Sequence, residues 1–200
     1  MLSSVKLLNK NLVGRCGGRE LFNFKPGINI LAGPNGSGKS TLLRAIMKSS
    51  NSTRLSTNVA HIEISDPRFP MPLLYHSSEE VVKSEDTNKG SNLLSLQANA
   101  ESHGQTLSKY LIGLENLIDP SIVLIDEPET ALDLDHLLGF AETLQAKVAE
   151  GMQFVIATHH PVLWMMDNVN FLIFGSNRKY VRECITVFRD ISSTKKARAS

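Results

Sequence analysis

Short apolar runs bounded by glycine, proline and polar residues divide much of the chain into strands, and some longer segments have helical periodicity. Strands are predicted where such runs alternate with polar residues or are wholly apolar; they fall at residues 4–8, 19–24, 28–32, 59–64, 73–75, 122–125, 153–158, 169–174 and 184–188. Helices are predicted where apolar residues return about once per turn; they fall at residues 41–48, 106–118 and 134–150.

The order of these elements indicates the fold class. Strands alternate with helices from residue 28 to residue 174, and parallel strands need such crossover helices. The order therefore predicts an α/β fold with a mostly parallel sheet and helices on both faces. The short strands before residue 28 are predicted to form an N-terminal antiparallel β region. Ligands of such folds bind at the carboxyl ends of the strands.

Composition supports one large domain. The chain has 200 residues, of which 42% are hydrophobic and 20% charged, as in an ordinary globular protein. We place the domain at residues 1–191 and predict an unstructured tail at 192–200, because that segment is basic and poor in apolar residues. Residues 77–91 are polar and charged, which predicts an exposed loop or insertion.

Charge and cysteine content exclude several classes of protein. Lys and Arg total 21 against 20 Asp and Glu, a net charge of +1, so charge gives no support to a nucleic-acid partner, although a local basic patch stays open. Cys16 and Cys184 have no metal-ligand spacing and form no disulfide framework, which favours a reducing, cytoplasmic setting.

No apolar run approaches the roughly 18 residues of a membrane span, and the first residues do not resemble a signal peptide. We therefore expect no transmembrane segment in this chain.

A glycine-rich loop lies between the predicted strand 28–32 and the predicted helix 41–48. It fits the phosphate-loop pattern G-x-x-x-x-G-K-[ST] and consists of Gly33, Pro34, Asn35, Gly36, Ser37, Gly38, Lys39, Ser40 and Thr41. The glycines let successive backbone N–H groups face one point, and the start of the helix adds its positive dipole end. Lys39 is predicted to reach the β- and γ-phosphates, and Ser40 to bind Mg²⁺. The motif predicts binding of a nucleoside triphosphate without choosing ATP over GTP.

Two carboxylates, Asp126 and Glu127, follow the aliphatic strand 122–125. Asp126 is predicted to hold Mg²⁺, and Glu127 to orient and deprotonate the attacking water. The alternative is a pair of solvated acids at a strand end. The upstream phosphate loop disfavours that alternative, because it requires a metal-binding carboxylate on a neighbouring strand.

With these motifs the chain resembles the ATP-binding cassette (ABC) ATPase superfamily over about residues 5–175. Residues 33–41 resemble its Walker A motif, residues 122–127 its Walker B motif and residues 131–133 its D-loop. Thr158-His159 resembles the switch-histidine motif. The family's signature, Leu-Ser-Gly-Gly-Gln, is matched in part: the matching residues are Ser102, Gly104 and Gln105, and the departures are Glu101 and His103.

The resemblance implies a P-loop NTPase fold with a short helical signature subdomain within or after the insertion at residues 77–105. It implies ATP and Mg²⁺ as cofactors and ATP hydrolysis, with Lys39, Glu127 and His159 as catalytic residues and His159 contacting the γ-phosphate and the attacking water. It also implies an ATP-dependent homodimer, because Lys39 of one chain faces Ser102 of the other. The family's Q-loop glutamine and its adenine-stacking aromatic have no evident counterparts in this sequence.

Two features indicate the kind of ABC ATPase: the length of the segment between the motifs and the residue that follows Pro128. The segment from Lys39 to Ser102 is short for a transporter subunit, and Glu129 follows Asp126-Glu127-Pro128 where transporters usually carry threonine. We therefore expect a small soluble ABC-type ATPase with a protein partner that the sequence does not identify. The alternatives are the ATP-binding subunit of an ABC transporter and a low-turnover nucleotide-dependent switch.

Overall fold

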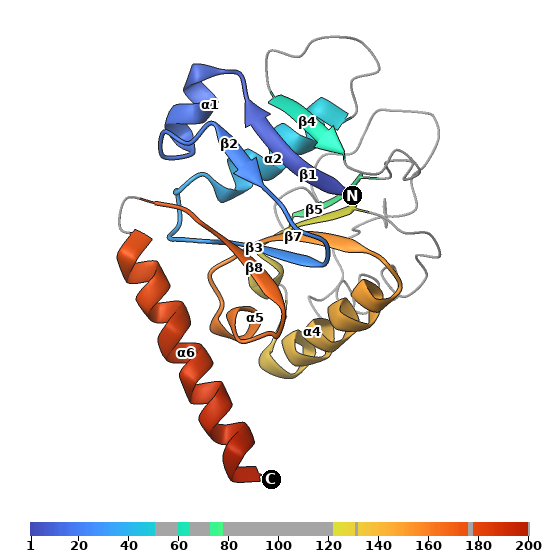
Figure 1. Cartoon of the computed structure of the whole chain (residues 1–200), viewed down its shortest axis with the longest axis vertical. Helices are drawn as coiled ribbons and strands as arrows, with labels where there is room; N and C mark the ends of the chain where they lie inside the picture. Colours follow the sequence, from blue (N-terminus) through green and yellow to red (C-terminus); the bar gives the residue numbers. More distant parts are fainter. Residues whose placement is uncertain (51–59, 65–72, 78–121, 131, 176–177, 200) are drawn as a thin grey trace.

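A five-stranded parallel sheet forms the centre of the molecule (Figure 1). The computed structural model describes residues 1–50, 60–64, 73–77, 122–130, 132–175 and 178–199. The strand order is β5-β6-β7-β3-β8, and every neighbouring pair is parallel. The strands are β3 (Ile28–Ala32), β5 (Leu73–Ser77), β6 (Ile122–Asp126), β7 (Gln153–Thr158) and β8 (Val169–Ile173). Each falls on a predicted strand, so the parallel α/β prediction is confirmed.

A smaller antiparallel sheet confirms the predicted N-terminal β region. Strand β1 (Leu2–Leu7) lies between β2 (Leu21–Asn23) and β4 (Ala60–Ile64) and is antiparallel to both. A helix that the sequence analysis missed, α1 (Lys10–Arg15), joins β1 to β2. Asn9 caps it, because its side-chain oxygen accepts hydrogen bonds from two backbone N–H groups of the first turn.

Helices cover both faces of the parallel sheet. Helix α2 (Lys39–Ser50) shares one hydrophobic core with the antiparallel sheet. Helices α4 (Leu134–Ala149) and α5 (Pro161–Trp164) share the other. The central strands alternate between these two cores; in β7, for example, Phe154 and Ile156 face the second core, and Val155 and Ala157 face the first. Such two-sided burial explains the wholly apolar strand sequences.

One predicted strand is wrong. Residues 184–188 lie in helix α6 (Arg178–Ala199). Their β-branched and aromatic composition favoured a strand, but the buried positions recur once per helical turn. Val181 and Ile185 are buried in the second core, and Cys184 and Phe188 pack beside them.

The segment predicted to be an unstructured tail is helical as far as Ala199. It continues α6, and Figure 1 shows the C-terminal end of that helix projecting away from the sheets. Lys, Ala and Arg are good helix formers, so an existing helix extends over them at little cost.

Several predictions lie outside the described residues. These are the helix at 106–118, most of the insertion at 77–105 and the signature residues Ser102, Gly104 and Gln105. Among the residues that the structure does describe, no helix is both long enough and apolar enough to cross a membrane.

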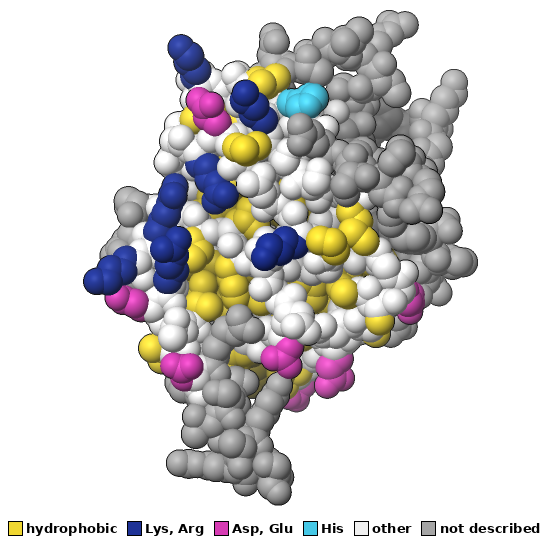
Figure 2. Space-filling view, in the orientation of Figure 1, with side chains coloured by type: hydrophobic (Ala, Val, Ile, Leu, Met, Phe, Trp, Pro, Cys, Tyr) yellow, Lys and Arg dark blue, Asp and Glu magenta, His cyan; other side chains and the backbone are white. Residues whose placement is uncertain are grey.

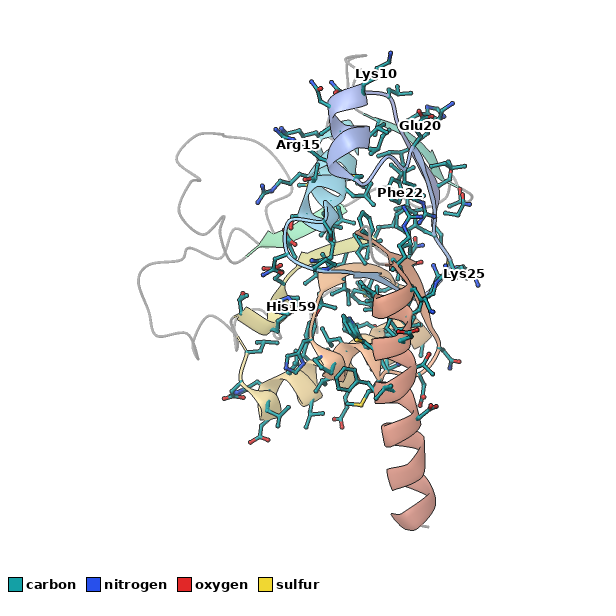
Figure 3. The ribbon with its side chains drawn as sticks, turned by 90° about the vertical axis from the view of Figure 1, so that its left-hand side faces the viewer. Lys10, Arg15, Glu20, Phe22, Lys25 and His159 are labelled. Atoms are coloured by element: carbon teal, nitrogen blue, oxygen red, sulfur yellow. The ribbon has the colours of Figure 1, made fainter. Side chains whose placement is uncertain are left out.

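Basic side chains gather on one face of the molecule although the net charge is only +1. Figure 2 shows Lys and Arg side chains over β2 and the start of α6. Arg19 lies 4.8 Å above the Phe22 ring, and burial, with the nearby Arg178 charge, lowers the pKa of its guanidinium. Figure 3 shows Lys25 on this side and His159 on the opposite side of the molecule. The local basic patch left open by the sequence therefore exists, away from His159.

Candidate nucleotide-binding site

Parallel strand ends bring the predicted site residues to one edge of the sheet. In the register, Ala32 at the end of β3 lies beside Thr158 of β7, and Asp126 of β6 lies beside Ala157. The phosphate loop leaves β3 at this edge, and the acidic pair leaves β6. The structure thus unites segments more than 80 residues apart, as the doubly wound topology requires.

Close backbone packing fixes the phosphate loop at two glycines. A Cβ on Gly38 would lie 2.3 Å from the Arg15 carbonyl oxygen, and φ at Gly38 is 98°. A Cβ on Gly33 would lie 2.8 Å from the Phe174 carbonyl oxygen. The Cys16 thiol donates to the Gly38 carbonyl oxygen at 3.6 Å. The end of helix α1, which the sequence analysis missed, therefore braces the loop at Gly38, and Phe174 braces it at Gly33.

The remaining loop residues lie between β3 and the first turn of α2. Pro34, Asn35 and Gly36 are exposed, and Ser40 and Thr41 lie in the first turn of α2. The Ser37 hydroxyl is buried and has no hydrogen-bond partner among the described residues. An exposed loop with an unused donor beside the start of a helix suits an anionic ligand.

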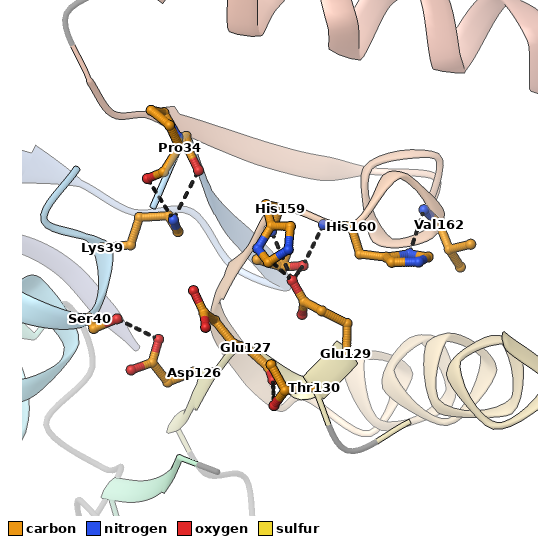
Figure 4. Close-up of polar contacts among 12 residues, drawn as sticks. Pro34, Lys39, Ser40, Asp126, Glu127, Glu129, Thr130, His159, His160 and Val162 are labelled. Atoms are coloured by element: carbon orange, nitrogen blue, oxygen red, sulfur yellow. Dashed lines mark hydrogen bonds and ion pairs between the residues drawn. The ribbon is translucent and has the colours of Figure 1, made fainter. Parts of the chain in front are cut away.

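The Lys39 ammonium group is buried, and its hydrogen bonds go to neutral backbone oxygens. Its residue surface is 3% exposed, and its Nζ donates to the backbone oxygens of Gly33 at 2.9 Å and Pro34 at 3.0 Å (Figure 4). Burial lowers the pKa of this ammonium group, and the nearby carboxylates of Glu127, Asp126 and Glu129 act in the opposite direction. The carbonyl oxygens that hold the ammonium group are neutral. An anion attracts the ammonium group more strongly and would displace them.

Ser40 and Asp126 meet across the boundary between α2 and β6. The Ser40 hydroxyl donates to Oδ1 of Asp126 at 2.8 Å. A hydroxyl and a carboxylate oxygen in contact are ligands that Mg²⁺ accepts alongside water and phosphate oxygens. The residues present therefore fit the predicted ion.

Glu127 adopts a backbone conformation that the sequence does not reveal. Its φ is 49°, in the left-handed region that few residues other than glycine adopt. Its N–H donates to the Ala157 carbonyl oxygen at 2.8 Å, and its own carbonyl oxygen accepts from the N–H and the hydroxyl of Thr130. Figure 4 shows the Asp126 and Glu127 carboxylates directed toward the same side after this turn, where their predicted metal and water roles would place them.

The two adjacent histidines have different surroundings. His160 caps α5, because its Nδ1 accepts from the Val162 N–H at 3.3 Å. His159 is 46% exposed, and its Nδ1 lies 3.2 Å from Oε1 of Glu129. Glu129 lies in the 3₁₀ turn Pro128–Thr130. Local structure thus separates the predicted switch histidine from its neighbour, and Glu129 is a contact that sequence reasoning missed.

Comparisons with known proteins establish the family of this chain. The AAA domain family matches residues 15–124. The cytochrome c biogenesis ATP-binding export protein CcmA of Ruegeria pomeroyi is 32% identical over 154 residues, which are 69% of this chain and 74% of that protein. The chain belongs to the ATP-binding cassette (ABC) ATPase superfamily. The resemblance stated from the motifs is therefore confirmed.

Two further similarities extend the comparison. This ABC ATPase is 31% identical to the zinc import ATP-binding protein ZnuC of Paracoccus denitrificans over 163 residues, which cover 72% of this chain and 63% of ZnuC. The crystal structure of an ATP-binding cassette of an ABC transporter, in its ADP conformation, matches with a TM-score of 0.55. That match covers 93% of this chain and 95% of the other at 13% identity, and it shows the P-loop fold of the ABC ATPases.

Proposed function

We propose that this ABC ATPase binds ATP with Mg²⁺ and hydrolyses it to ADP and phosphate. The observation that carries the proposal is the convergence of Lys39, the bonded Ser40–Asp126 pair and Glu127 at one edge of the sheet. Membership of the superfamily supports ATP as the nucleotide. In this role the protein is a cytoplasmic enzyme.

Binding would begin with an exchange of partners at Lys39. The ammonium group now contacts two neutral carbonyl oxygens, and phosphate oxygens form stronger, charge-assisted hydrogen bonds. Lys39 would therefore move from Gly33 and Pro34 to the β- and γ-phosphates. The loop N–H groups and the N-terminus of α2 would complete the anion site. Ser40 and Asp126 would hold Mg²⁺, which supplies positive charge to the phosphate oxygens when bound.

Glu127 would act as the general base. It accepts a proton from water as the water oxygen bonds to the γ-phosphorus. The bond from that phosphorus to the bridging oxygen breaks, and ADP leaves with the electron pair. His159 would contact the γ-phosphate and the attacking water.

An ATPase assay with matched variants tests the enzyme role. Glu127→Gln is expected to keep ATP binding and to lower kcat by on the order of 100-fold or more, the usual contribution of a general base. Glu142→Gln, at an exposed position of α4, is the control and should hydrolyse at the wild-type rate. Equal rates for Glu127→Gln and wild type would assign water activation to another group. Wild-type protein that binds ATP but barely hydrolyses it would favour the low-turnover switch.

We also propose ATP-dependent homodimerisation, with each ATP between Lys39 of one chain and the signature residues Ser102, Gly104 and Gln105 of the other. Such a two-fold interface is self-complementary. Light scattering of the Glu127→Gln protein with ATP and Mg²⁺ should give a dimer, and the same protein without nucleotide a monomer. Ser102→Arg should abolish the dimer and leave ATP binding by the monomer intact. A monomer under all conditions would favour a lone phosphate-loop ATPase.

The transporter alternative is supported by the names of the relatives. The CcmA relative is called an export protein and the ZnuC relative an import protein. Co-purification with ATP and Mg²⁺ separates the two functions. Recovery of a membrane protein in stoichiometric amount would favour a transporter subunit, and its absence from detergent extracts would favour the stand-alone ATPase.

A further inference from the structure

The Glu129 carboxylate joins the end of the Walker B segment to the switch-histidine segment. Its Oε1 accepts a hydrogen bond from the Thr158 hydroxyl at 2.7 Å and from the His159 N–H at 2.9 Å. The same oxygen lies 3.2 Å from Nδ1 of His159 (Figure 4). The backbone N–H of the histidine therefore donates to this carboxylate oxygen, and the histidine ring lies beside the same oxygen.

The burial of this carboxylate is unusual for a purely structural contact. The Glu129 side chain is 6% exposed, whereas the His159 side chain is 46% exposed. Its second oxygen, Oε2, is buried without a hydrogen-bond partner among the described residues. Burying a carboxylate with one unsatisfied oxygen costs free energy, so the position of Glu129 calls for an explanation.

We propose that Glu129 is a positioning residue that holds His159 in its Nδ1–H tautomer. An ionised carboxylate can only accept hydrogen bonds, so it favours the tautomer in which the ring nitrogen beside it carries the proton. In the neutral ring Nε2 is then an acceptor, suited to a hydrogen of the attacking water. In the doubly protonated ring Nε2–H is a donor, suited to the γ-phosphate. This inference rests on the proposed function for its consequence, but the tautomer itself exists without nucleotide.

In this arrangement Glu127 and Glu129 have different roles. Glu127 is held through its backbone by Ala157 and Thr130, and Figure 4 shows its side chain directed toward the Lys39 side of the site. Glu129 instead faces the histidine. A base acting on water and a carboxylate orienting a histidine follow the logic of a catalytic triad, in which the carboxylate fixes the tautomer of the imidazole.

Nitrogen NMR of the nucleotide-free full chain tests the tautomer directly. Two-bond ¹H–¹⁵N correlation spectra at a pH where the histidines are neutral distinguish the two forms, and His159→Gln assigns the signal. Wild type and Glu142→Ala should show the Nδ1–H form. Glu129→Ala should show the Nε2–H form, and Glu129→Gln, which keeps an acceptor oxygen toward the same donors, should retain the Nδ1–H form. A wild-type Nε2–H tautomer, or no change in Glu129→Ala, would overturn the inference.

Steady-state kinetics then tests the consequence. Glu129→Ala is expected to lower kcat by about 10- to 100-fold, the cost found for carboxylates that orient metal-binding histidines, with KM for ATP nearly unchanged. In the His159→Ala background Glu129→Ala should cause no further loss, because residues that act as a unit are not additive. A further loss of the same size there would overturn the inference.

Failure of the inference and failure of the proposed function give different results. A His159→Ala protein that hydrolyses ATP at the wild-type rate would count against the role proposed for the histidine. An impaired His159→Ala protein beside a Glu129→Ala protein with wild-type kcat would overturn the inference alone.

Discussion

Replacing Glu127 by glycine is expected to stabilise the protein and to slow ATP hydrolysis. With φ at 49°, Glu127 occupies a conformation that costs an L-residue about 1–2 kcal/mol. Glycine avoids that cost but loses about 0.5–1 kcal/mol through the greater freedom of the unfolded chain. The backbone change alone should therefore raise the free energy of unfolding by up to about 1.5 kcal/mol.

Two further variants isolate the backbone contribution. Glu127→Gln removes the charge beside Asp126, Glu129 and Lys39 but keeps the left-handed backbone, so the difference between the glycine and glutamine variants reports the backbone alone. Asn168→Gly is a control of the same kind, because Asn168 also has a positive φ of 56° and is exposed. Asparagine tolerates this conformation better than glutamate, so the gain there should be smaller.

Urea unfolding of the nucleotide-free proteins, with ATPase assays on the same samples, gives the comparison. Glu127→Gly should be more stable than Glu127→Gln, and both should hydrolyse ATP at least about 100-fold more slowly than wild type. A glycine variant less stable than the glutamine variant would refute the reasoning, since it would mean that the left-handed turn at the end of β6 is not strained.

The remaining predictions concern binding, pH and the C-terminal helix. Lys39→Ala is expected to weaken ATP binding in calorimetry by about 10- to 100-fold, because a charge-assisted contact is lost; unchanged affinity would remove the phosphate-loop assignment. Burial raises the pKa of the Cys16 thiol from 9.0 to about 11, so its contribution to stability should be complete below pH 9 and be lost as the pH rises through about 11. In that window the unfolding free energy of Cys16→Ala should fall less steeply than that of wild type. Deleting residues 192–200 should shift Tm by less than about 2 °C, and a larger fall would show that the end of α6 docks.

The sequence predicts those parts of the site in which local chemistry dictates the backbone. The glycines, Lys39 and Ser40 lie in one continuous motif, so the fold around them could be inferred from spacing alone. Helix α6 could not, because its β-branched residues favour a strand when considered alone, and only the buried stripe that begins at Val181 shows the helical period. The left-handed Glu127 depends on an acceptor at Ala157, which a neighbouring strand supplies. The Glu129–His159 contact joins two segments 30 residues apart in sequence, and only the pairing of β6 with β7 brings them together.

The position of β3 between β7 and β8 affects how the protein can be made. Both neighbours of β3 (Ile28–Ala32) begin more than 120 residues after it in the sequence. During synthesis from the N-terminus, this apolar strand leaves the ribosome long before either partner exists, and pairings of high contact order form slowly. The phosphate loop that follows β3 therefore cannot take its final shape until β8 has emerged. Nascent chains that stop before β7 should expose β3 as an unpaired apolar strand and should not bind nucleotide. Early binding of a chaperone to the nascent chain would therefore be an advantage.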